Sequence, residues 1–77
     1  MKEGDFVKLN NGGRIGVITE IMPCDGYNLY LIAYHNGMKI RTMYAKEERV
    51  KTLLTKRQFL DYIKKSGNTS MYQYINN

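Results

Sequence analysis

Few residues of this chain have the chemistry that covalent catalysis requires. A cysteine nucleophile needs a histidine base nearby and an acid that orients the base. The chain offers one cysteine and one histidine, Cys24 and His35, with Asp25 as the adjacent acid. Cys24 is expected in a loop and His35 at the tip of a hairpin, so this set does not indicate a triad. We predict that the protein is not an enzyme.

Other common chemical sites also lack their residue pattern. A single cysteine excludes an internal disulfide, and with one histidine there is no cluster with metal-ligand spacing. Glu47 and Glu48 are flanked by bases in KEERVK and are expected in a solvated turn. The glycines at 12, 13 and 16 precede neither a P-loop Lys-Ser/Thr nor a helix, so they do not predict a phosphate site. We predict no metal and no cofactor.

The charge of the chain favours a polyanionic partner. Twelve Lys and Arg against seven Asp and Glu give a net charge of +5. Residues 1–45 carry five basic and four acidic side chains, a net charge of +1, whereas residues 46–77 carry seven and three, a net charge of +4. Such a balance suits nucleic acid, although many small proteins are basic merely for solubility.

Basic and aromatic side chains on exposed strands and near loops are the candidates for nucleic-acid contact. Lysine and arginine would bind phosphates, and tyrosine would stack on bases. The candidates are Lys8, Arg14, Tyr27, Tyr30, Lys39, Arg41 and Lys56. The alternative is an ordinary solvated strand face, and the neighbours Arg57, Asp61 and Lys65 can neutralise one another at helical spacing. With that local pairing, Lys56 would be the cation of this helical turn that is not part of the pairing.

The elements that must position these residues are short strands in a single domain. At 77 residues the chain has room for one core. Val7 and Leu9 alternate with Lys8 as in a half-buried strand, NNGG follows as a turn, and RIGVITEI is the second strand. Gly16 interrupts that strand, which usually marks a bulge or a close approach of another backbone.

The middle of the chain predicts a loop followed by a hairpin. PCDGYN at 23–28 is the expected loop, and two strands at 29–45 are joined at Asn36 and Gly37. A two-residue turn would place one set of side chains on one face: Leu29, Leu31, Ala33, Ile40, Thr42 and Tyr44. A three-residue loop at 35–37 would instead gather Tyr30, Ile32, Tyr34, Met38, Ile40, Thr42 and Tyr44. In both registers Lys39 and Arg41 point outward.

The last part of the chain predicts a strand and a capped helix. KEER at 46–49 is a polar turn and VKTL at 50–53 a strand. Thr55 and Gln58 have the spacing of a capping box at the start of a helix. Leu54 and Phe59 have the spacing of a hydrophobic staple. Gly67 suits the C-cap at the end of the helix. The helix should bury Phe59, Leu60 and Ile63 against the small barrel that we expect these strands to form. Residues 68–77 suit either a helical turn or an extended segment that docks on this chain or on a second copy.

The order of these elements resembles a known group of small barrels. EGDFVKLNNGGRIGVITEI is similar to the opening of SH3-like barrels of the KOW and Tudor type, and YLIAYHNGMKIRTMYAKEERVKTL to their later strands. The resemblance covers residues 3–54 and implies a five-stranded SH3-like barrel, mainly β, followed by a C-terminal α-helix. The expected organisation is a barrel at 1–54, a helix at 55–67 packed on it, and a tail at 68–77. Such barrels are binding modules that are seldom catalytic.

Two functions from different classes follow from this sequence. The first is a non-catalytic module that binds RNA or DNA through a basic strand face. The second is a protein-interaction module, an inhibitor or adaptor that uses a strand edge or the Tyr-rich tail. Very small, basic, Tyr-rich barrels also resemble products of phages and mobile elements.

The N-terminus has no apolar signal region, and no run approaches the roughly 20 apolar residues of a membrane span, so we expect a cytoplasmic protein with no membrane partner.

Overall fold

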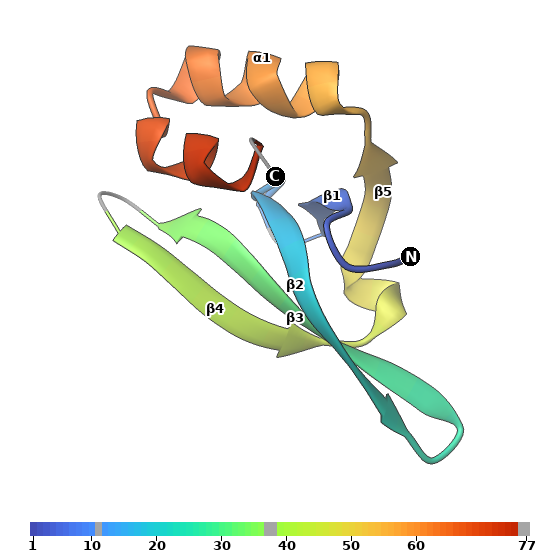
Figure 1. The fold of residues 1–77 in the computed structure, drawn as a ribbon. Coiled ribbons are helices and arrows are strands. Elements are labelled where there is room, and N and C mark those ends of the chain that lie inside the picture. Colours follow the sequence, from blue (N-terminus) through green and yellow to red (C-terminus); the bar gives the residue numbers. More distant parts are fainter. Residues whose placement is uncertain (11, 37–38, 76–77) are drawn as a thin grey trace.

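The structure is a computed structural model that describes residues 1–10, 12–36 and 39–75 (Figure 1). It is mainly β, and the predicted five strands followed by a C-terminal helix are confirmed. The elements in chain order are β1 (Phe6–Leu9), β2 (Ile15–Cys24), β3 (Tyr27–Asn36), β4 (Lys39–Ala45), the 3-10 helix η1 (Glu47–Arg49), β5 (Val50–Leu54), α1 (Lys56–Ser66) and the 3-10 helix η2 (Thr69–Tyr74).

The five strands form one antiparallel sheet in the order β4-β3-β2-β1-β5. Each strand pairs with its neighbour in sequence except β5, which crosses over to pair with β1. In the described part of the chain no pairing joins β4 to β5, so these two strands are the edges of the sheet. Closure of the sheet into an SH3-like barrel therefore stays a prediction.

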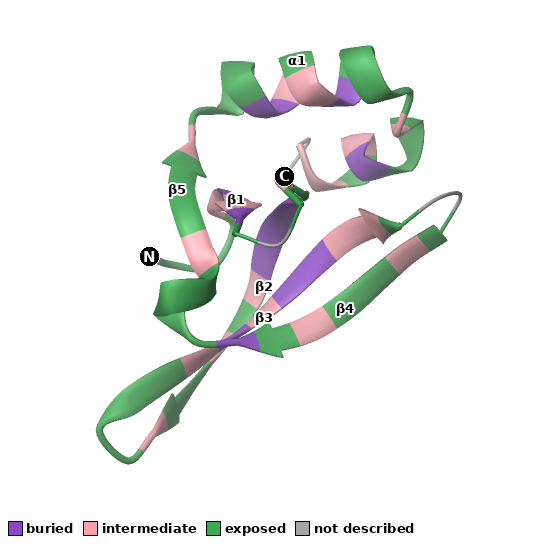
Figure 2. Ribbon diagram, turned by 180° about the vertical axis from the view of Figure 1, so that it is seen from behind, coloured by how far each residue is buried: buried purple, intermediate pink, exposed green. Residues whose placement is uncertain are grey.

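The two faces of the sheet bury separate hydrophobic clusters. The first, called the inner cluster, consists of Val7, Leu9, Ile18, Tyr30, Ile32 and Ala45. The second, called the helix cluster, lies on the opposite face, where Ile15 packs with Phe59 and Ile63 of α1 and with Met71 of η2. The rings of Phe6 and Phe59 stack with centroids 4.3 Å apart and tie β1 to the helix. Figure 2 shows the buried residues where the strands lie below α1, whereas the far end of the β2–β3 hairpin is largely exposed.

Gly16 is the point of close backbone approach that its position in a β-branched run predicts. A Cβ atom at this residue would lie 2.7 Å from the carbonyl oxygen of Ala33 and 2.7 Å from Cγ2 of Ile32. The bulge itself lies further along β2, where the register with β3 shifts between Ile18 and Glu20. The extra residue, Thr19, donates a hydrogen bond from Oγ1 to the Leu31 carbonyl at 3.1 Å.

The prediction of a loop at 23–28 is wrong. Pro23 and Cys24 end β2, Tyr27 begins β3, and a two-residue Asp25-Gly26 turn joins the strands, with Gly26 at φ 81°. Asp-Gly is a favoured sequence for such turns because glycine adopts positive φ without strain. Pro23 is tolerated because β1 pairs only with the beginning of β2, so this stretch of β2 is an edge that can lack an N–H donor.

The face predicted for the three-residue loop of the β3–β4 hairpin is wrong, and the face predicted for the two-residue turn is confirmed, because Leu31 pairs with Tyr44 and Ala33 with Thr42. Asn36 pairs with Lys39 and Tyr34 with Arg41, so Tyr30, Ile32 and Tyr34 share a face with Ala45, Met43 and Arg41. Residues 37 and 38, which include the predicted turn glycine, lie outside the described residues. A register depends on the whole hairpin rather than on the turn sequence alone, because every slip by one residue exchanges the two faces. Lys39 and Arg41 are exposed, as predicted.

The helix signals are confirmed in detail. The Gln58 N–H donates to Thr55 Oγ1 at 3.1 Å and the Thr55 N–H donates to Gln58 Oε1 at 2.8 Å, which completes the capping box. Gly67 is left-handed with φ 73°, and its N–H donates to the Ile63 carbonyl at 2.9 Å. Phe59 and Ile63 are buried, whereas Leu60 is only half-buried. Among the described residues, no helix has the length and apolar character that crossing a bilayer requires.

The end of the described chain docks on its own fold, and the helical alternative for this segment is correct. Residues 69–74 form η2, Met71 is buried in the helix cluster, and Tyr72, Tyr74 and Ile75 pack against that cluster. KEER likewise contains a short 3-10 turn, η1, which leads directly into β5.

The capping box gives a direct test of helix stability. Thr55→Ala leaves the Gln58 N–H without its acceptor, so we expect a loss of about 0.5–2 kcal/mol in the free energy of unfolding. Thr55→Ser keeps the hydroxyl and should retain most of that stability. Urea denaturation followed by circular dichroism measures both. Equal stability of the alanine variant and the parent would contradict the role of this cap.

The close approach at Gly16 gives a second test. Gly16→Ala places a methyl group against the Ala33 carbonyl, so we expect it to cost about 1–3 kcal/mol, as overpacking of a core does. Thr42→Ala, at an exposed position of β4, should stay within about 0.5 kcal/mol of the parent. Urea denaturation compares the two variants. If Gly16→Ala is as stable as the Thr42 control, β2 and β3 are not in contact at this point.

Candidate nucleic-acid interface

Three of the predicted basic residues lie in the same region of the structure as Tyr34. Tyr34 lies on β3 directly opposite Arg41 on β4, and the guanidinium carbon of Arg14 lies 5.5 Å from the centroid of the Tyr34 ring. Lys39 lies two residues before Arg41, on the same face of β4. We call this group, Arg14, Tyr34, Lys39 and Arg41, the basic cluster. Arg14, Lys39 and Arg41 are exposed, and Tyr34 is half-buried.

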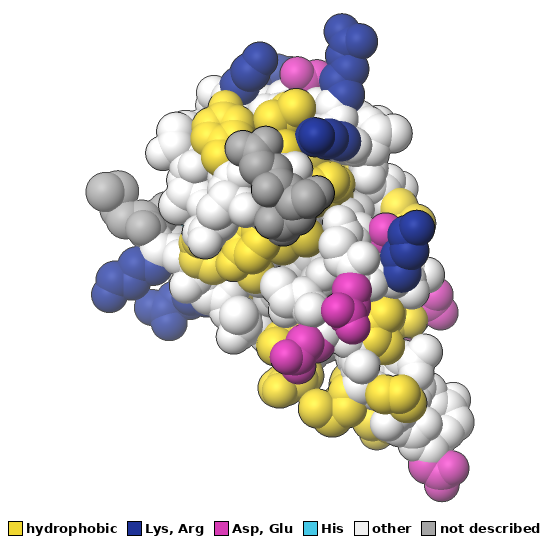
Figure 3. All heavy atoms as spheres, viewed as in Figure 1, with side chains coloured by type: hydrophobic (Ala, Val, Ile, Leu, Met, Phe, Trp, Pro, Cys, Tyr) yellow, Lys and Arg dark blue, Asp and Glu magenta, His cyan; other side chains and the backbone are white. Residues whose placement is uncertain are grey.

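The local structure explains why these side chains meet. Tyr34 pairs with Gly16 on its β2 side and with Arg41 on its β4 side. Because Gly16 has no side chain, the position beside Tyr34 on β2 is open, and Arg14, just before β2, lies against the ring. A cation over an aromatic face is attracted to it by about 0.5–1 kcal/mol at an exposed site. Figure 3 shows Lys and Arg side chains at the edge of the molecule where β4 begins.

A small pocket borders the basic cluster. It has a volume of about 140 Å³ and lies between the beginning of β2 and the end of α1. Its lining includes Gly13, Arg14, His35, Tyr62, Ser66 and Asn68. Arg14 therefore lines the pocket and belongs to the basic cluster, which places uncharged polar groups next to the cations.

Lys8 does not join the basic cluster. It is half-buried on the helix face of β1, where its Nζ donates a hydrogen bond to the Tyr62 hydroxyl at 2.9 Å and lies 5.2 Å from the centroid of the Tyr62 ring. The hydrogen bond and the positive charge of Lys8 lower the pKa of Tyr62 below its ordinary value, and Lys65 and Lys51 contribute in the same direction. The lysine is engaged within the fold rather than presented to a ligand.

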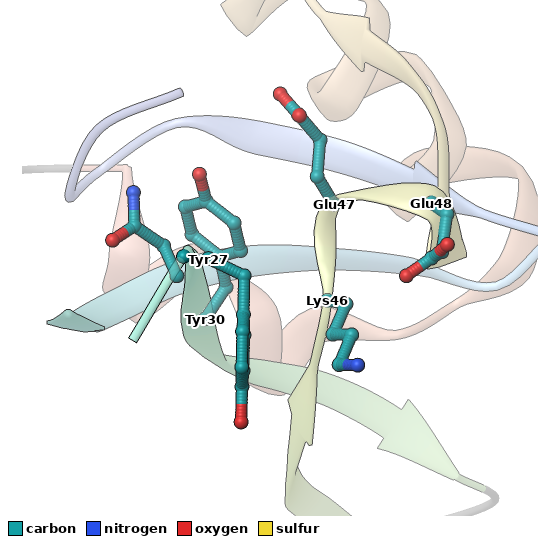
Figure 4. Close-up of a pocket in the computed structure, with 7 residues that line it drawn as sticks. Tyr27, Tyr30, Lys46, Glu47 and Glu48 are labelled. Atoms are coloured by element: carbon teal, nitrogen blue, oxygen red, sulfur yellow. The ribbon is translucent and has the colours of Figure 1, made fainter. Parts of the chain in front are cut away.

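Tyr27 and Tyr30 also lie away from the basic cluster. Tyr27 begins β3 and is about 23 Å from Tyr34 at about 3.3 Å per residue of strand. Its ring is 46% exposed and already faces the ammonium of Lys46 at 4.5 Å, as Figure 4 shows. Tyr30 is only 5% exposed because it belongs to the inner cluster, so its ring faces are not available for stacking.

Lys56 is exposed in the first turn of α1, and the structure does not bring it to the basic cluster. Of the seven predicted residues, Arg14, Lys39 and Arg41 therefore form a group, whereas Lys8, Tyr27, Tyr30 and Lys56 each lie elsewhere. Sequence reasoning missed Tyr34, on which Arg14 lies. The correct β3–β4 register would have identified it, because that register places Tyr34 opposite Arg41.

The residues considered for catalysis are far apart. Cys24 pairs with Tyr27 at one end of β3, and His35 pairs with Ile40 near the other end. The strand between Tyr27 and His35 spans about 26 Å at about 3.3 Å per residue, so the thiol and the imidazole cannot act together. Within the described residues, no group of three or more His, Cys, Asp or Glu side chains could hold a metal ion.

A scan against protein-family models and searches of curated proteins and of solved structures found no match to this chain. The resemblance to SH3-like barrels of the KOW and Tudor type therefore stays a prediction.

The Lys8–Tyr62 contact predicts an altered tyrosine titration. Because the ammonium stabilises the phenolate, Tyr62 should lose its proton at lower pH than an ordinary tyrosine, and Lys8→Met should raise its pKa toward the usual value of about 10. NMR of the tyrosine ring carbons follows the titration, with Tyr62→Phe assigning the signal. A Tyr62 pKa that does not change in Lys8→Met would contradict the contact.

Proposed function

We propose that this protein is a small, non-catalytic module that binds nucleic acid through the basic cluster. The observation that carries the proposal is that Arg14 lies over the ring of Tyr34, that Arg41 pairs with Tyr34, and that all three cations, Lys39 included, are exposed. Contacts to phosphates dominate the affinity of most nucleic-acid complexes and need only exposed cations at a suitable spacing. The net charge of +5 would add long-range attraction.

The arginines are well suited to this role. A guanidinium can lie flat on an aromatic ring and still present its edge N–H groups to the oxygens of a phosphate. Arg14, lying against Tyr34, would lose less conformational freedom on binding than an unrestrained arginine. The binding we propose relies mainly on contacts to phosphates, which carry no sequence information, so it should depend only weakly on sequence.

Substitution of Lys39 and Arg41 tests this proposal. Lys39→Ala and Arg41→Ala should each weaken binding of a fluorescently labelled oligonucleotide, measured by anisotropy. Each should also reduce the slope of log affinity against log salt by about 0.9 on duplex DNA, or about 0.7 on a single strand. Thermal melts should be unchanged, because both side chains are exposed.

Lys64→Ala provides the matched control, since it removes the same charge from an exposed position of α1. It should leave the salt slope unchanged. The proposal is overturned if the Lys39→Ala/Arg41→Ala double variant binds as tightly as the parent with the same slope. It is also overturned if no oligonucleotide binds more tightly than about 10⁻⁴ M, which is weaker than ordinary non-specific binding.

A further inference from the structure

One face of the sheet carries a strip of exposed and half-buried hydrophobic side chains on the β2–β3 hairpin and the adjoining part of β4. The strip consists of Met22, Tyr27, Leu29, Leu31 and Tyr44, and we call it the apolar strip. Its most exposed members are Met22 at 44%, Tyr27 at 46% and Tyr44 at 55%. Apart from these three, the only large hydrophobic residue this exposed among the described residues is Leu53 on β5.

The register places these residues on one face. Met22 pairs with Leu29, and Leu31 pairs with Tyr44. Tyr27, Leu29 and Leu31 alternate along β3, so their side chains point to the same side of the sheet. This is the face that α1 and η2 cover further along the strands, where Ile15 and Ile40 enter the helix cluster. In Figure 1 the helices do not extend over the β2–β3 hairpin. The apolar strip, with Met22, Tyr27 and Tyr44 exposed, therefore continues this face beyond the helices.

The bulge at Thr19 produces this arrangement. Before the bulge, Ile18 points to the inner cluster and Val17 to the helix face. Without the extra residue, strict alternation would send Ile21 to the helix face and Met22 inward. With it, Ile21 packs against the inner cluster and Met22 joins the apolar strip. The bulge therefore causes the exposure of Met22. The hydrogen bond from the Thr19 hydroxyl to the Leu31 carbonyl stabilises the bulge.

Acidic residues lie at both ends of the apolar strip and in a pocket beside it, which Lys46 also lines. Glu20 lies opposite Leu31 at one end, and Asp25 lies in the turn at the other. Glu47 and Glu48 of η1 line a pocket of about 340 Å³ together with Tyr27 and Tyr30 (Figure 4). Figure 3 shows hydrophobic side chains with Asp and Glu side chains on this part of the molecule, whereas most Lys and Arg side chains lie toward the helix and the start of β4.

The exposed hydrophobic side chains and the nearby carboxylates together indicate what kind of ligand this surface would bind. The carboxylates repel phosphates, so the surface does not suit nucleic acid. The ring of Tyr27 already faces the Lys46 ammonium at 4.5 Å, so this part of the surface accepts a cation against an aromatic ring. We propose that the apolar strip docks a protein segment in which hydrophobic side chains are flanked by Lys or Arg. The hydrophobic side chains would cover Met22, Leu29, Leu31 and Tyr44, and a cation would enter the pocket beside Tyr27. This proposal does not depend on nucleic-acid binding.

Two short synthetic peptides test the proposal, one with Leu alternating with Lys and one with Leu alternating with Glu. Each is titrated into the ¹⁵N-labelled full chain and followed by NMR. The Leu/Lys peptide should shift the amide signals of residues 20–31 and 43–48, and the Leu/Glu peptide should bind at least about tenfold more weakly. Equal affinities of the two peptides, or shifts confined to the basic cluster, would overturn the proposal.

Two variants separate the hydrophobic and the electrostatic contributions. The Met22→Ser/Tyr44→Ser double variant should weaken binding of the Leu/Lys peptide at least about tenfold, because it removes the most exposed apolar contacts. Glu47→Gln/Glu48→Gln should also weaken it and should reduce its salt dependence. Both changes are at exposed positions, so the fold should be retained, as amide spectra of the variants would verify.

Leu53→Ser is the matched control, since Leu53 is equally exposed but lies on β5 outside the apolar strip. It should leave peptide affinity unchanged. Affinity that both strip variants leave unchanged would overturn the proposal. Sedimentation equilibrium adds a further outcome. If the parent forms a dimer that Met22→Ser/Tyr44→Ser converts to monomer, the occupant is a second copy of this chain, and the proposal of a basic segment is wrong.

Discussion

The close packing of β2 against β3 at Gly16 is the constraint on which the rest of this structure depends. Gly16 pairs with Val7 on β1 and with Tyr34 on β3, so it lies where the three central strands meet. Because Gly16 has no side chain, Ile32 can fill the inner cluster at this point. For the same reason, the position next to Tyr34 on β2 is open. Both the core and the basic cluster therefore rely on the same missing Cβ atom.

The parts of the fold that local sequence determines could be predicted, and those that depend on distant contacts could not. The helix was predictable because Thr55, Gln58 and Gly67 are specific to helix ends, and all three act as their spacing predicts. The existence of the strands was predictable from alternation and turn residues. The choice between the two registers of the β3–β4 hairpin was not, because it is decided by which side chains the core accepts and not by the turn.

The candidate site shows the same division. Exposure of Lys39 and Arg41 could be predicted because it did not depend on the register, whereas the partnership of Arg14 with Tyr34 required the correct pairing. Tyr30 illustrates the opposite error. A tyrosine near a turn suggested stacking on a base, but its place opposite Ala45 puts its ring in the inner cluster. The strand β3 thus has the cations of the basic cluster beside one end, at Tyr34, and exposed hydrophobic groups near the other, at Tyr27, so the sheet would present two chemically different surfaces to two different partners.

The helix cluster joins residues from opposite ends of the chain. Phe6 stacks on Phe59, Lys8 bonds Tyr62 across 54 positions, and Met71 of η2 fills the same cluster. Contacts between residues so far apart in sequence slow folding, because the entropy of closing the loop is lost before the contacts form. During synthesis, β1 would leave the ribosome long before its packing partners exist. Until Phe59, Ile63 and Met71 have emerged, Phe6 and Ile15 lack their packing partners, so the nascent chain is open to aggregation or chaperone binding over that period.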